Sequence, residues 1–188
     1  MADNGPNGHQ GFTLWMTGLS GSGKSTITDV LIDKFEERGI PLEVLDGDIV
    51  RENLSKGLGF SKEDRDTNIT RIGFVADLLA RNGVPVITAA ISPYRETRQQ
   101  VRDMHDATGA RFIETFIATS LEACEERDVK GLYAKARSGE IPEFTGVSDP
   151  YEEPESPELR VETEGKSPEE SAQEVIAFLE GEGLIPSA

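Results

Sequence analysis

The sequence contains few of the residues that build disulfides and metal centres. Its 188 residues include one cysteine, Cys124, and two histidines, His9 and His105. A single cysteine excludes an internal disulfide and a cysteine-built zinc site, and two histidines alone do not make a usual zinc centre. We therefore expect the chain in a reducing compartment, for which the cytoplasm is the simplest assignment.

Long hydrophobic runs are also missing. The longest, such as residues 84–91, are far too short to span a bilayer, so we expect no membrane association. The first ten residues, MADNGPNGHQ, are polar and lack the apolar segment of a secretory signal. We expect residues 1–10 to form a disordered tail and residues 11–188 to form a single domain.

Positive charge is scarce. Lysine and arginine number 19 against 35 aspartates and glutamates, which gives a formal net charge of −16. This balance argues against nucleic-acid binding, which needs a basic footprint. An acidic, solvated surface that aids solubility is the ordinary explanation. Anionic substrates are not excluded, because the local field in a cleft matters more to them than the total charge.

Apolar runs and amphipathic runs alternate along the chain, which is typical of a mainly parallel sheet covered by helices on both faces. The sequence therefore predicts an α/β protein with a three-layer α/β/α fold. Residues 131–157 are punctuated by glycine and proline and are expected to form a lid. Capping boxes are expected at Thr119-x-x-Glu122 and Ser167-x-x-Glu170, and His105 is expected on a helix surface. The predicted strands are 12–16, 42–45, 84–91 and 112–118, and the predicted helices are 24–38, 68–82, 95–107 and one that begins after residue 167.

The most informative stretch is GLSGSGKST at residues 18–26, which fits the pattern G-x-x-x-x-G-K-[ST]. It follows a predicted strand and opens a predicted helix, which is the context that identifies a P-loop, so the predicted three-layer fold is of the P-loop NTPase type. Its backbone N–H groups would cradle phosphates, Lys24 would reach the β- and γ-phosphates, and Ser25 would ligate Mg²⁺. The residues predicted to bind ATP are Gly18, Leu19, Ser20, Gly21, Ser22, Gly23, Lys24, Ser25 and Thr26.

A second candidate site begins with Asp46-Gly47-Asp48, which should end the second strand and face the phosphates. Two carboxylates could hold Mg²⁺ or accept a proton from an attacking hydroxyl, and the residues alone do not decide which carboxylate does so. A simple Asp-Gly turn with Asp48 as a helix cap is the structural alternative.

A basic and aromatic cluster follows, made of Arg51, Phe60, Arg65, Asn68 and Arg71. Arginines recognise phosphate or sulfate, and Phe60 could stack on a base. Surface ion pairing with nearby carboxylates is the alternative. For Arg71 the sequence favours neither ligand recognition nor surface ion pairing.

Four stretches of the chain resemble the adenylylsulfate (APS) kinase family. They are GLSGSGKST at 18–26, LDGDIVRENLSKGLGFSKEDRDTNITRIG at 45–73, ISPYRETRQQVR at 91–102 and RDVKGLYAKARSGEIPEFTGVSDPYEEPESPE at 127–158. The resemblance implies transfer of the ATP γ-phosphate to the 3′-hydroxyl of adenosine 5′-phosphosulfate (APS), which gives PAPS and ADP in sulfate assimilation. It also implies a homodimer that requires ATP and Mg²⁺.

The same resemblance implies catalytic roles. Lys24 and Ser25 would bind ATP and Mg²⁺, Asp46 would organise the metal, and Asp48 would lie near the acceptor hydroxyl as the base. Ser92 is often labelled a phosphoserine intermediate in this family. Direct in-line transfer needs only positioning and charge neutralisation, so we expect Ser92 to hydrogen-bond the substrate instead.

The residues implied to bind APS fall into three groups. Some would hold the phosphosulfate, some would stack on the adenine, and some would line the pocket and its lid. In that order they are Arg51, Arg65 and Asn68; Phe60 and Phe144; and Asp48, Ile91, Ser92, Lys130 and Leu132.

Two other functions remain open on the sequence alone. Another small-molecule kinase could use the P-loop with a nucleoside monophosphate or sugar acceptor. A non-catalytic module of the same fold could sense PAPS or hold a partner enzyme, although such modules should have lost P-loop or aspartate residues. Lys24, Ser25, Asp46 and Asp48 are all present here.

Overall fold

A five-stranded parallel sheet forms the centre of the protein. The computed structural model describes residues 10–187, apart from the side chain of Asp48, so most of the predicted tail lies outside the described residues. The strand order is β2-β3-β1-β4-β5, and each of the four neighbouring pairs is parallel. The strands are β1 (Phe12–Thr17), β2 (Glu43–Asp46), β3 (Val86–Ala89), β4 (Arg111–Ala118) and β5 (Leu159–Glu162).

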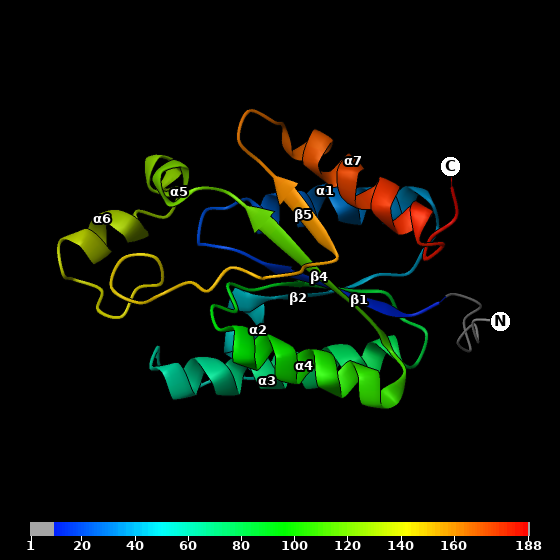
Figure 1. The fold of residues 1–188 in the computed structure, drawn as a ribbon, viewed down its shortest axis with the longest axis horizontal. Coiled ribbons are helices and arrows are strands. Elements are labelled where there is room, and N and C mark those ends of the chain that lie inside the picture. Colours follow the sequence, from blue (N-terminus) through cyan, green and yellow to red (C-terminus); the bar gives the residue numbers. More distant parts are fainter. Residues whose placement is uncertain (1–9, 188) are drawn as a thin grey trace.

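Helices cover both faces of this sheet, as Figure 1 shows. Helices α1 (Lys24–Glu37) and α7 (Pro168–Gly181) pack on one face, while α3 (Lys62–Ala80) and α4 (Arg95–Thr108) pack on the other. The predicted three-layer α/β/α fold is confirmed. The remaining short helices are α2 (Gly47–Asn53), α5 (Leu121–Arg127) and α6 (Leu132–Arg137).

The alternation of side chains along the central strand β1 divides the core in two. Phe12, Leu14 and Met16 face the cluster built with α1 and α7, and Trp15 faces the smaller cluster under α3 and α4. All six residues of β1 are buried, as expected for the middle strand of a parallel sheet. The loops after β1, β2 and β3 therefore meet at the carboxyl edge of the sheet, where ligands bind in such folds.

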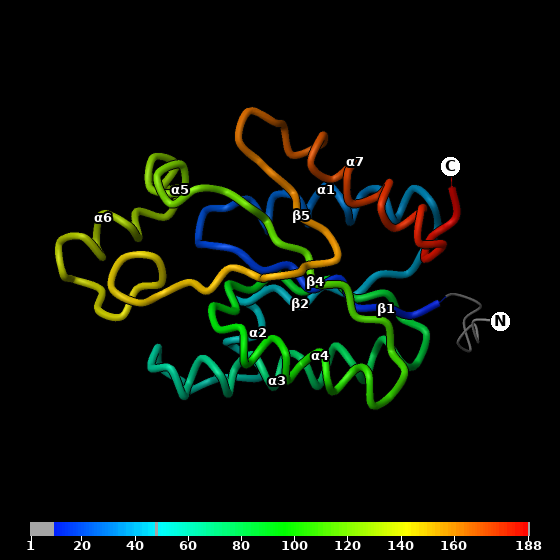
Figure 2. Tube along the Cα trace, viewed as in Figure 1, coloured from blue at the N-terminus to red at the C-terminus, as the bar shows by residue number. Residues whose placement is uncertain are grey.

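Beyond that edge the chain leaves the sheet through α5 and α6 and returns to β5, as Figure 2 shows. This excursion contains the predicted lid, residues 131–157. The sequence did not reveal the short helix α6 inside it.

Several predicted boundaries are wrong. Helix α3 begins at Lys62 rather than at 68, because the Ser61 hydroxyl accepts a hydrogen bond from the backbone N–H of Asp64 and caps it. Strand β3 is shorter than predicted, and the helix α2 that starts at Gly47 was not predicted. The cap of α5 is Ser120, not Thr119, whereas the capping box at Ser167 and Glu170 is confirmed.

His105 is not on a helix surface, as predicted, but fully buried. Its Nε2 lies 2.9 Å from the Thr13 hydroxyl and its Nδ1 lies 2.8 Å from the carbonyl oxygen of Val101. Between residues 10 and 187, no helix is both long and apolar enough to cross a lipid bilayer.

Candidate active site

The P-loop connects β1 to α1 and depends on glycine. Gly18, Gly21 and Gly23 have φ angles of 154°, 76° and 108°, which side-chain-bearing residues rarely adopt. A Cβ atom on Gly18 would also stand 2.7 Å from the carbonyl oxygen of Ile117. Gly23 caps α1 without a side-chain hydrogen bond, so the first N–H groups of the helix are left to bind an anion.

Lys24 lies folded against this loop. Its ammonium donates to the carbonyl oxygens of Gly18 at 2.8 Å and Leu19 at 2.7 Å, and the residue is 8% exposed. Burial lowers the pKa of Lys24 from 10.5 to about 8, although Cys124 and Asp46 act in the opposite direction. A phosphate bound in the loop would favour the charged ammonium again.

Two oxygen ligands come together beside the loop. The Ser25 hydroxyl, in the first turn of α1, lies 3.3 Å from Oδ2 of Asp46, the last residue of β2. Within the part of the chain that the structure describes, no three His, Cys, Asp or Glu side chains gather into a metal site. The pair suits Mg²⁺, which takes one or two protein ligands and completes its shell with phosphate oxygens and water. The side chain of Asp48 lies outside the described residues.

Ser92 occupies the loop after β3, next to these groups. The residue is 2% exposed and has a φ of 42°, an unusual conformation for a non-glycine residue. The indole Nε1–H of Trp15 donates to the Ser92 hydroxyl at 3.2 Å. The Ser92 side chain is thus fixed from within the sheet and keeps one proton with which to donate a hydrogen bond.

A cleft of about 610 Å³ joins the P-loop, the β2 and β3 loops and the lid. Its size is that of a small-molecule site. Gly18, Leu19 and Ser22 do not line it: Leu19 and Ser22 are buried and support the loop from behind. The predicted site residues that line the cleft are Ser20, Gly21, Gly23, Lys24, Ser25, Thr26, Asp46, Arg51, Phe60, Arg65, Asn68, Ile91, Ser92, Lys130, Leu132 and Phe144.

Three of these residues bring recognition groups to the cleft from α2, α3 and the loop between them. The Arg51 guanidinium lies 4.4 Å from the centre of the Phe60 ring, which is 58% exposed. Asn68 is 6% exposed, and its buried Oδ1 has no hydrogen-bond partner. A buried polar atom without a partner is costly, so Oδ1 is available to a donor on a ligand.

Arg65 binds residues of the lid in this structure. Its guanidinium donates to the Thr145 hydroxyl and the Glu143 carbonyl and lies 3.6 Å from Oδ2 of Asp149. These contacts join α3 to the lid across the cleft. Arg71 lies outside the cleft, where it donates to the carbonyl oxygen of Leu54 at 2.9 Å.

The sequence reasoning missed the residues that attach the lid to the P-loop. Tyr133 of α6 donates its hydroxyl to the carbonyl oxygen of Ser20 at 2.8 Å, and its ring meets that of Phe144 edge-on at 5.1 Å. Asp128 accepts from the first backbone N–H groups of α6, which lowers the pKa of its carboxyl. Tyr133 stands in the quoted KGLY string, but no spacing rule identifies its partner.

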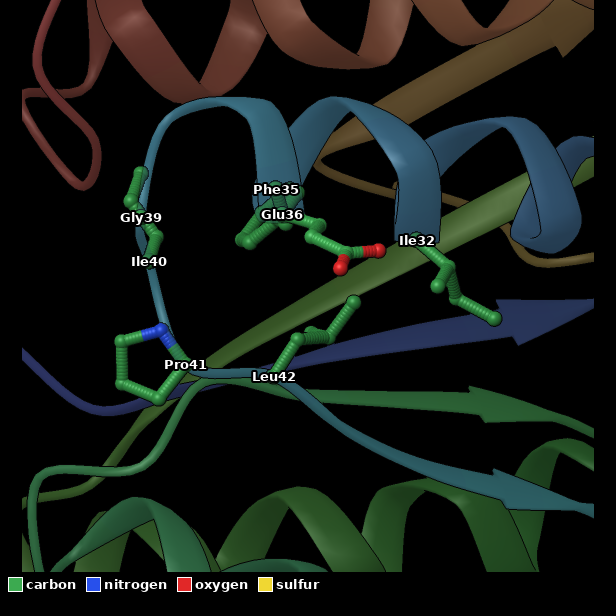
Figure 3. Close-up of a pocket in the computed structure, with 7 residues that line it drawn as sticks. All are labelled: Ile32, Phe35, Glu36, Gly39, Ile40, Pro41 and Leu42. Atoms are coloured by element: carbon green, nitrogen blue, oxygen red, sulfur yellow. The ribbon is translucent and has the colours of Figure 1, made fainter.

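A second depression lies far from this chemistry. It is formed where α1 turns toward β2, at the opposite end of α1 from the P-loop, and Figure 3 shows its side chains. Glu36 is the only charged side chain among an otherwise apolar set, so the depression lacks the converging polar groups of a catalytic site. The set is Ile32, Phe35, Glu36, Gly39, Ile40, Pro41 and Leu42.

Comparison with known proteins agrees with this geometry. The adenylylsulphate kinase family model matches residues 10–162. The adenylyl-sulfate kinase of Rippkaea orientalis is 59% identical over 176 residues, which cover 94% of this chain and 95% of that protein.

Two solved structures are also similar. The Mycobacterium tuberculosis APS kinase CysC in complex with AMPPNP and APS has a TM-score of 0.88 and 49% identity, over 92% of this chain and 99% of that one. The hexameric APS kinase from Thiobacillus denitrificans has a TM-score of 0.74 and 41% identity, over 94% of this chain and 30% of that one. The resemblance inferred from the sequence is confirmed: this chain belongs to the adenylylsulphate kinase family.

Proposed function

We propose that this chain transfers the γ-phosphate of ATP to the 3′-hydroxyl of APS, giving PAPS and ADP for sulfate assimilation. The observation that carries the assignment is one cleft that the P-loop lines together with the predicted acceptor residues Phe60, Asn68 and Ser92. The family membership agrees with the activity.

On the donor side, the P-loop binds ATP. Its backbone N–H groups and the N-terminus of α1 hold the phosphate oxygens, and Lys24 turns from the loop carbonyls toward the β- and γ-phosphates. Ser25 and Asp46 hold Mg²⁺, which when bound neutralises charge that develops on the phosphates. The 3.3 Å separation of their oxygens supports this pairing.

On the acceptor side, the side chains hold APS so that its 3′-oxygen lies in line with the γ-phosphate. Arg51 binds the phosphosulfate, and Phe60 and Phe144 stack on the adenine. The unpaired Oδ1 of Asn68 accepts a hydrogen bond from a donor on APS. A bond forms between the 3′-oxygen and the γ-phosphorus while the bond to the β–γ bridging oxygen breaks. The hydroxyl proton passes to a carboxylate, either Asp46 or Asp48.

The lid, residues 131–157, closes the cleft and excludes water from the transfer. Lys130 and Leu132 approach the acceptor from the lid side, and Arg65 holds the lid by its contacts with Glu143 and Thr145. Arg65 therefore acts through the lid as well as through the charge that it brings to the phosphosulfate.

Assembly and location belong to the same proposal. The chain works in the cytoplasm as a homodimer. The dimer is supported by two exposed apolar side chains that lie one turn apart on α3, Phe74 and Leu78. Sedimentation of the wild type and of Phe74→Asp tests this: a dimer that becomes a monomer in the variant is expected, and a monomeric or hexameric wild type contradicts it.

The decisive experiment measures ADP release from Mg·ATP with and without APS and identifies PAPS by its mass. A strict requirement for APS, with PAPS formed, is the expected result. AMP, adenosine and a set of sugars serve as alternative acceptors. Turnover with one of those instead would indicate another small-molecule kinase, and ATP binding without turnover would indicate a non-catalytic module.

A further inference from the structure

Arg98, in the first turn of α4, is buried, and each of its three side-chain nitrogens donates a hydrogen bond. The residue is 2% exposed, and its Nε donates to Oε1 of Glu114 at 2.7 Å. Its Nη1 donates to the carbonyl oxygen of Ser92 and its Nη2 to the carbonyl oxygen of Glu152, each at 2.6 Å. Arg98 does not line the cleft, so it would act on a substrate only through the residues that it holds.

The first of those residues, Ser92, needs to be held. At a φ of 42° its backbone lies in the left-handed region, which is unfavourable for a residue with a Cβ. Such a conformation persists only when surrounding contacts over-determine it. Here Arg98 fixes the carbonyl oxygen, Trp15 fixes the hydroxyl, and the Thr17 hydroxyl donates to the preceding carbonyl of Ile91 at 2.7 Å.

The second of those residues, Glu152, lies near the end of the lid. Its backbone N–H donates to the carbonyl oxygen of Pro93 at 2.9 Å, and its carboxylate accepts from the backbone N–H of Arg95 at 2.8 Å. Arg98 therefore joins the Ser92 loop to the end of the lid with one planar, forked group. A lysine carries its three donors on one nitrogen, so it cannot reproduce the separate positions of Nε, Nη1 and Nη2 from which Arg98 reaches Glu114, Ser92 and Glu152.

We propose that Arg98 is a positioning residue for the acceptor: its guanidinium holds the Ser92 loop and the end of the lid in the arrangement that binds APS. The inference rests on the proposed function, because it assigns the Ser92 loop to the APS site. It assigns Arg98 no contact with either substrate.

The chain supplies its own reporter and its own control. Trp15 is the only tryptophan, so a ¹H–¹⁵N spectrum holds one indole resonance, and that N–H is the donor to Ser92. Arg102 lies one turn further along α4 and binds Glu158 at 2.8 Å through Nη2, and it shares Glu114 with Arg98. No hydrogen bond joins Arg102 to Ser92 or Glu152 among the described residues, so Arg102→Gln removes the same charge without touching the loop.

The experiment compares Arg98→Gln, Arg98→Lys and Arg102→Gln for the indole resonance, the KM for APS, the KM for ATP and thermal stability. We expect both Arg98 variants to shift the indole resonance and to raise the KM for APS about tenfold or more, with the KM for ATP within twofold. Arg102→Gln should change stability alone. Arg98→Lys keeps a charge beside Glu114, so it provides the test if Arg98→Gln does not fold.

Three results would overturn the proposal. An unmoved indole resonance in Arg98→Lys would show that Arg98 does not hold Ser92. A moved resonance with an unchanged KM for APS would show that the Ser92 loop is not part of the acceptor site, although APS turnover itself would still stand. An equal rise in the KM for APS in Arg98→Lys and Arg102→Gln would show that both arginines act only by stabilising the fold. Failure of the proposed function would appear separately, as wild-type protein without APS-dependent turnover.

Discussion

Gly73 on α3 lies so close to Val101 on α4 that a Cβ atom on the glycine would stand 2.6 Å from Cγ2 of the valine. The backbone of Gly73 is helical, so the close approach of the two helices, rather than a turn, requires the glycine. The contact sets how α3, which carries Arg65 and Asn68, packs beside α4, which carries Arg98. The packing of these two helices therefore affects the positions of the cleft residues on α3 and of Arg98 on α4.

Gly73→Ala should destabilise the protein. Alanine gains about 1 kcal/mol of helix propensity over glycine, but overpacking at a rigid contact costs about 1–3 kcal/mol. We expect a net loss of up to about 2 kcal/mol in the free energy of unfolding, measured in urea. In a Val101→Ala background the same substitution should be neutral or stabilising, because the two methyl groups in its way are gone. Equal effects in the two backgrounds would contradict the contact.

Asp46→Asn should abolish most turnover, because it removes the carboxylate beside Ser25. We expect kcat to fall about 100-fold or more at saturating Mg²⁺, while nucleotide binding persists through the P-loop. Glu43→Gln, at the exposed start of the same strand, removes the same charge away from the site and should leave kcat within twofold. Steady-state assays over a range of Mg²⁺ concentrations make the comparison. If Asp46→Asn turned over at the wild-type rate, Asp46 would be neither a required Mg²⁺ ligand nor the base.

ATP binding should take up a proton in mildly alkaline solution. In the free protein the pKa of Lys24 is lowered to about 8, so at pH 9 its side chain is mostly neutral, whereas bound phosphates favour the charged form. Titration calorimetry in two buffers of different ionisation enthalpy should therefore show an uptake of about one proton at pH 9 and little at pH 7. ATP affinity should weaken as pH rises above 8. The Lys24→Met variant should show no uptake at either pH, and an equal uptake by that variant would assign the proton to another group.

The donor half of the site could be predicted from the sequence because its pattern is local. The P-loop, its lysine and its serine occupy consecutive positions between a strand and a helix, and the structure places them so. The acceptor half was located largely through the resemblance, and the structure gathers its predicted residues in one cleft, apart from Asp48, whose side chain lies outside the described residues. What holds that half in place was not predictable, since Trp15 and Ser92 are 77 residues apart.

The errors have the same origin. A 3.6-residue pattern cannot tell a buried polar side chain from an exposed one, and His105 was misplaced because its partner Thr13 is 92 residues away. Thr119 was taken for a helix cap, but its hydroxyl donates to the carbonyl oxygen of Ser22 and supports the P-loop. Short helices such as α2 and α6 have too few residues for a period to be seen.

Stability should fall in mild acid because of His105. Its Nδ1 must donate to the carbonyl oxygen of Val101, and in the neutral ring, which burial favours, its Nε2 accepts from the Thr13 hydroxyl. Burial lowers the pKa of His105 below 6.5, against the smaller opposing effects of the Val101 carbonyl and Asp77. The unfolded chain therefore takes up a proton first, and the stability present above pH 6.5 is lost as pH falls from there toward the folded pKa.

Replacing this histidine tests the assignment. Over that window the wild type should lose up to about 1.4 kcal/mol per pH unit more than His105→Gln, which cannot titrate. At pH 7.5 the variant should be less stable by about 1–3 kcal/mol, because two buried hydrogen bonds are disturbed. Urea denaturation at pH 7.5, 6.5 and 5.5 gives both quantities. Carboxylates titrate in both proteins, so only the difference between the two profiles belongs to His105, and parallel profiles would assign the acid sensitivity to those carboxylates instead.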